Sequence, residues 1–66
     1  MESYVGKVLV EDDEGSRFYV HEYVTKRLFR RFHRYMLDTG EAVRALDGQR
    51  FEIRNTGEIL VRVDEE

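Results

Sequence analysis

The sequence predicts a small, mainly β domain, either an antiparallel sheet or a partly open barrel of five to six strands. Short runs rich in β-branched and aromatic residues alternate with turn motifs, which is typical of an all-β chain. The 66 residues, with five Gly and no Pro, allow a single domain over residues 1–66. Curling the sheet would let so short a chain build a two-sided core and protect its edges.

The N-terminal part predicts a β-hairpin. Residues 3–10, SYVGKVLV, carry three Val and predict a strand. Residues 11–16, EDDEGS, predict a turn in which Gly15 can take a positive φ. Residues 17–24, RFYVHEYV, are aromatic and β-branched and predict the returning strand.

The C-terminal part predicts a three-stranded meander. Its strands are expected at residues 41–46, 49–54 and 58–63. Asp47-Gly48 is typical of a two-residue hairpin loop. Asn55-Thr56-Gly57 fits a three-residue loop that ends with Gly57 in the left-handed region. The end of the chain, residues 64–66, is expected to fray.

Two further patterns in this part make structural predictions. DTGEAVR at 38–44 is similar to NTGEILVR at 55–62. If the same turn chemistry is used twice, the residues before Asp38 form a strand, as those before Asn55 do. One sheet face is expected to carry Ala42, Leu46, Phe51 and Ile53, together with alternate residues of the last strand.

Residues 24–37 leave two alternatives. The first is a strand over about 32–38, preceded by a turn or a short helical piece at about 25–30. The second is a helix over 24–37, which would make the fold α+β with the order ββ-α-βββ. The helix is suggested by apolar residues on one arc of a helical wheel, from Val24 to Met36. The many aromatic residues argue against it.

Composition limits the classes of function. The chain has no Cys, which excludes disulfides and thiolate metal sites and is consistent with a cytoplasmic location. No apolar run approaches the ~18 residues that a membrane span needs, so no membrane association is expected. A domain of this size without disulfides is only marginally stable, and self-association commonly compensates for that. A homo-oligomer is therefore expected.

Charge is unevenly distributed along the chain. Residues 25–34 contain five of the 11 Lys and Arg and no carboxylate, although the net charge of the chain is −3. The candidate binding residues are the five basic ones in this segment, Lys26, Arg27, Arg30, Arg31 and Arg34. Interleaved aromatics make the segment a candidate for nucleic-acid binding, in which cations neutralise phosphates and rings stack on bases. A solvated face that pairs with the protein's own carboxylates is the favoured alternative.

No other motif indicates chemistry. The acidic run Glu11–Glu14 lacks the ligand spacing of an EF-hand and predicts a solvated turn, or a contact with the basic stretch of a neighbouring subunit. His21-Glu22 is not followed by the second His of a zinc motif, because Thr25 occupies that position. We therefore expect no catalytic residues, no metal and no cofactor.

The sequence thus predicts a non-catalytic module for protein interaction or self-association. The alternative is a nucleic-acid-binding domain that uses the basic cluster at 26–34.

Overall fold

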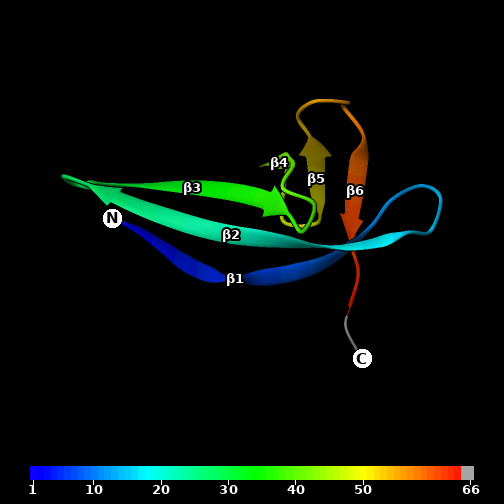
Figure 1. Ribbon diagram of the computed structural model, residues 1–66, viewed down its shortest axis with the longest axis horizontal. Coiled ribbons are helices and arrows are strands. Elements are labelled where there is room, and N and C mark those ends of the chain that lie inside the picture. Colours follow the sequence, from blue (N-terminus) through cyan, green and yellow to red (C-terminus); the bar gives the residue numbers. More distant parts are fainter. Residues whose placement is uncertain (65–66) are drawn as a thin grey trace.

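The computed structural model describes residues 1–64 and is all-β (Figure 1). Six antiparallel strands pair in chain order and close into a small barrel. They are β1 (Glu2–Glu11), β2 (Arg17–Arg27), β3 (Arg30–Leu37), β4 (Ala42–Ala45), β5 (Arg50–Ile53) and β6 (Ile59–Arg62). The predicted fold class is confirmed, and the alternative helix over 24–37 is not formed. The expected fraying concerned residues 64–66, of which 65 and 66 lie outside the described part. The described residues include no helix that could span a membrane.

The first three strands are much longer than the barrel requires. β1 meets β6 only at Val10 and Glu11, and β3 meets β4 only at Tyr35 and Met36. Beyond these contacts β1, β2 and β3 continue together as a three-stranded arm, which Figure 1 shows extending to one side of the barrel. The arm comprises residues 2–7, 22–27 and 30–34. The molecule is consequently elongated, with extents of 41 × 29 × 21 Å.

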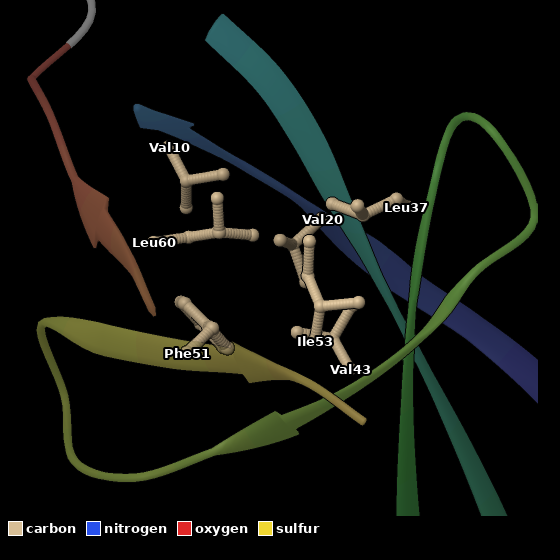
Figure 2. Packing of buried hydrophobic residues seen from close by; sticks show 7 residues of the cluster. All are labelled: Val10, Val20, Leu37, Val43, Phe51, Ile53 and Leu60. Atoms are coloured by element: carbon tan, nitrogen blue, oxygen red, sulfur yellow. The ribbon is translucent and has the colours of Figure 1, made fainter. Parts of the chain in front are cut away.

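The hydrophobic core lies entirely in the barrel (Figure 2). It consists of Val10, Val20, Leu37, Val43, Phe51, Ile53 and Leu60, and all six strands contribute to it. Phe51 and Ile53 lie on the predicted inner face. Ala42 and Leu46 do not, because Val43 is the residue of β4 that points inward. A shift of one residue in a strand moves every side chain to the opposite face.

The turns were predicted well where glycine determines them. Gly15 and Gly57 have φ of 86° and 76°, as expected. A strand precedes Asp38, and residues 38–40 form a three-residue loop with Gly40 at φ 93°. The related loop after β5 is one residue longer than expected, spanning 54–57.

The two-residue loop predicted at Asp47-Gly48 is wrong. β4 and β5 are joined by residues 46–49, and Gly48 does not take a positive φ. The Asp47 carboxylate accepts hydrogen bonds from the backbone N–H of Gln49 and of Arg50, at 2.8 and 2.9 Å. It also binds the Arg50 guanidinium at 3.0 Å. These side-chain bonds stabilise a wider turn that needs no left-handed residue.

We expect Gly57→Ala to lower the free energy of unfolding by about 1–2 kcal/mol, because a Cβ is disfavoured in the left-handed region. No atom lies within 4 Å of the added Cβ, so the effect comes from backbone conformation alone. Gly48→Ala is the matched control, since its surroundings are equally open and its φ is not positive. Equal stability of the two variants in chemical denaturation would contradict this interpretation.

Candidate functional site

The segment that the sequence singled out forms the end of the arm. β2 ends at Arg27, β3 begins at Arg30, and Leu28-Phe29 is the two-residue loop between them. The turn expected over 25–30 is therefore shorter than predicted, and the strand begins earlier. We call residues 26–31 the basic tip. Its two loop side chains, Leu28 and Phe29, are fully exposed, at 99% and 102%.

Four cations surround these two apolar side chains. Lys26 lies opposite Arg31, and Arg27 lies opposite Arg30. Because side chains alternate along a strand, each pair occupies a different face of the ribbon. Like charges directly opposite one another are destabilising. No ion pair to these four side chains occurs within residues 1–64.

The backbone of the basic tip is also unfavourable for its sequence. Leu28 has a φ of 53° and is the one non-glycine residue in the described part of the chain with a positive φ. Hairpin loops of two residues normally place Gly, Asn or Asp at such a position. A left-handed Leu costs about 1–2 kcal/mol. Strain of this kind is concentrated at functional sites, where side-chain identity matters more than local preference.

Arg34, the fifth predicted cation, is separate from the other four. Its Nε and a terminal nitrogen both donate to the Glu2 carboxylate, at 2.9 Å each. Its guanidinium also lies over the ring of Tyr23, 4.7 Å from the ring centre. The bond to Arg34 lowers the pKa of Glu2, and Glu2 raises that of Arg34. Arg34 therefore links β1, β2 and β3 within the arm.

The same face of the arm carries further polar and aromatic contacts. Tyr23 packs edge-on against Tyr4, whose hydroxyl is hydrogen-bonded to Nδ1 of His21 at 2.9 Å. Nε2 of His21 in turn contacts the Asp38 carboxylate at 2.5 Å. These contacts fasten the arm to the barrel, so that the basic tip is held on a braced sheet. On the opposite face, His33 is hydrogen-bonded to Glu22 at 2.8 Å.

These contacts predict how stability depends on pH. The pKa of Asp38 is lowered, first by its bond to His21, and the pKa of Asp47 is lowered by the backbone N–H of Gln49 and by Arg50. A carboxyl whose pKa is lower in the folded state stabilises the fold above its unfolded pKa of about 4, and the contribution is lost as the pH falls through the folded value. The melting temperature should therefore fall between about pH 5 and pH 2.

Asp38→Asn isolates one of these contributions. The variant should melt lower than the wild type at neutral pH, and the difference should shrink as the pH falls below about 4. Thermal melts followed by circular dichroism at several pH values measure both curves. A difference that stays constant down to pH 2 would refute the role of the ionised Asp38.

A second surface lies on the barrel. It is a groove of about 320 Å³ along the outer side of β6 and the end of β1, lined by Glu11, Asp12, Asp13, Ile59, Val61 and Val63. Ile59 and Val61 are 40% and 46% exposed because their neighbour Leu60 points into the core. We call these six residues the acidic groove. Of its carboxylates, Glu11 has a cation nearby, with Arg17 at 3.5 Å.

Loops distant in sequence concentrate negative charge beside the acidic groove. The pKa of Glu58 is raised by partial desolvation and then by four other carboxylates. These are Asp12, Asp13 and Glu14 in the β1–β2 loop and Glu41 in the β3–β4 loop. The sequence had indicated the run at 11–14 but not Glu41 or Glu58, because only the closed barrel brings the three loops together.

The basic tip and the acidic groove both display apolar side chains beside charged ones. Within the described residues, no group of three or more His, Cys, Asp or Glu side chains is arranged to hold a metal ion. Comparisons with protein-family models, with curated proteins and with solved structures find no match. Function must therefore be inferred from the basic tip and the acidic groove themselves.

Proposed function

We propose that this protein is a non-catalytic interaction module that self-associates and uses the basic tip as its binding element. The observation that carries the proposal is the display of Leu28 and Phe29, both fully exposed, at the end of a braced arm. The left-handed Leu28 and the like charges that face one another across the ribbon lower the stability of the isolated chain, and its two large apolar side chains gain nothing from folding because they stay in contact with water. Burial against a partner would compensate for that loss.

The size of this compensation is sufficient for a weak association. Burying a Leu or Phe side chain contributes about 1.5–3 kcal/mol, and an affinity of 1 mM requires about 4 kcal/mol. The two side chains of one tip contribute roughly 3–6 kcal/mol before the cost in translational and side-chain entropy is subtracted, so the association is expected toward the millimolar end of the range from 1 µM to 1 mM.

A second way for copies of the chain to associate is pairing between the free sheet edges of their arms, and it is less well supported. Residues 2–7 of β1 and 30–34 of β3 have free edges. However, β1 has a bulge between Tyr4 and Gly6, and the free edge of β3 carries Arg30, Arg31 and Arg34. Bulges and charged side chains are devices that prevent edge pairing. The basic tip is therefore the better candidate for the interface.

The test is size-exclusion chromatography with light scattering over about 1 µM to 1 mM protein, the affinity range of a weak interface. We expect the mass to rise with concentration from that of one chain, 7.9 kDa, toward a defined multiple. A mass of one chain throughout would contradict self-association.

Nucleic acid is the second candidate partner, favoured by the four unpaired cations on a two-stranded ribbon. Such a ribbon fits the major groove of DNA, and Phe29 could stack on an unpaired base. Against this, the cations are split between two faces and the opposite end of the molecule is acidic, which repels a polyanion. We favour self-association for this reason, in a reducing compartment such as the cytoplasm because the chain lacks Cys.

Fluorescence anisotropy with short single- and double-stranded oligonucleotides at low salt separates the two candidates. Micromolar binding that weakens steeply with salt and disappears in Arg30→Ala/Arg31→Ala would favour nucleic acid. An absence of oligonucleotide binding even at low salt would refute the nucleic-acid candidate.

A further inference from the structure

We infer that the basic tip of one copy docks into the acidic groove of a second copy. This inference rests on the proposed self-association and identifies the surface that receives the tip. The argument combines the apolar composition, the charge and the placement of the two surfaces.

The two surfaces match in composition. The basic tip has two apolar side chains at its centre, Leu28 and Phe29, and four cations around them. The acidic groove has three apolar side chains, Ile59, Val61 and Val63, beside three carboxylates. An apolar centre with a charged rim is the usual organisation of a specific interface, and complementary rims raise both specificity and the rate of association.

Each surface also has charges that its own chain leaves uncompensated. The four tip cations have no ion pair within residues 1–64, and neither do Asp13, Glu14, Glu41 and Glu58 in that part of the chain. Cations face cations across the ribbon, and carboxylates of three loops crowd together near the groove. Contact between the two surfaces would relieve both repulsions. Two tips, or two grooves, would instead repel each other.

The shape of the molecule makes this contact intermolecular. The tip and the β1–β2 loop, which forms one wall of the groove, lie at opposite ends of the long axis (Figure 1). The molecule extends 41 Å along this axis, so the tip cannot reach the groove of its own chain. Two copies lying antiparallel could exchange tips and would close as a symmetric dimer, whereas a head-to-tail arrangement would leave one tip and one groove free at its ends.

A reciprocal charge exchange tests the inference. The tip variant reverses all four cations of the basic tip, Lys26→Glu/Arg27→Glu/Arg30→Glu/Arg31→Glu. The groove variant reverses four carboxylates in and beside the acidic groove that have no ion pair within residues 1–64, Asp13→Lys/Glu14→Lys/Glu41→Lys/Glu58→Lys. Neither set includes Asp12, whose carboxylate accepts hydrogen bonds from the backbone N–H of Glu14 and Ser16 and so supports the loop. Each variant alone should be a monomer, because its tip and groove then carry the same charge. A mixture of the two should associate one to one, because every tip meets a groove of opposite charge.

The readout is the mass by light scattering of each variant and of the mixture, at a concentration at which the wild type associates. Arg54→Glu, at an exposed arginine outside both surfaces, is the matched control and should associate like the wild type. We expect each exchange to weaken association at least about tenfold and the mixture to restore it. Circular dichroism confirms that each variant is folded.

The outcomes separate this inference from the proposed function. If the tip variant is monomeric but the groove variant still associates, the tip binds elsewhere and the inference is wrong while self-association stands. If both variants are monomeric and the mixture does not associate, the contact between tip and groove is refuted. A wild type that is monomeric at all concentrations would refute both proposals.

Discussion

Leu60→Ala is expected to lower the free energy of unfolding by about 2–5 kcal/mol, the usual cost of a cavity left by a buried Leu. Leu60 is fully buried, at 0% exposure, and belongs to a core of seven residues. A 66-residue domain has a total stability of about 3–10 kcal/mol. The substitution should therefore remove a large part of that stability, which urea denaturation would measure.

Leu28→Ala is the control with the same chemical change. Leu28 is 99% exposed, so its truncation leaves no cavity and should change the stability of the monomer by less than about 0.5 kcal/mol. Equal losses in the two variants would contradict the assignment of the stabilising core to the barrel alone.

Leu28→Gly/Phe29→Ser should weaken self-association at least about 100-fold, because two side chains that become buried contribute about 1.5–3 kcal/mol each. The monomer should remain at least as stable as the wild type. Gly is favoured at the left-handed position that Leu28 occupies with φ 53°, and the Ser replaces a fully exposed ring. Loss of association without loss of stability is the signature of an interface residue.

Sedimentation equilibrium measures the association constant, and thermal melts of dilute protein measure the stability of the monomer. Leu46→Ser is the matched control, since Leu46 is 40% exposed in a loop outside both surfaces. Association as strong in the tip variant as in the wild type would remove the basic tip from the proposed function.

The fold could be predicted where local chemistry determines it. Gly15, Gly40 and Gly57 occupy turns that need a left-handed residue, and β-branched or aromatic runs lie on either side of them. The prediction failed at Asp47-Gly48, because the carboxylate of Asp47 stabilises another turn. It did not decide between a strand and a helix in residues 24–37. Leu28-Phe29 is an unusual pair for a hairpin loop, and nothing local indicates that the chain reverses there.

The candidate site could be predicted only in part. The sequence identified the cations of the basic tip, but it also included Arg34, whose partner Glu2 is distant in sequence. Leu28 was not predicted to be functional, and Phe29 entered only as one of the aromatics interleaved with the cations, because both lie on the apolar arc that suggested a helix with these side chains in the core. Because β2 and β3 flank these two residues, they form a hairpin loop, and the side chains of such a loop are exposed. The acidic groove depends on closure of the barrel, which no local pattern encodes.

Intermolecular paramagnetic relaxation enhancement tests the docking of the basic tip most directly, because a spin label on one copy broadens the NMR signals of nearby residues in another copy. The chain has no Cys, so Thr25→Cys provides a single attachment point for a spin label beside the tip and leaves residues 26–31 unchanged. Labelled protein is mixed with ¹⁵N-labelled wild type at a concentration at which the chain associates. Our account predicts selective broadening of amide signals from residues 11–14 and 58–63. Broadening centred on the tip of the second copy, with the groove signals unaffected, would contradict it.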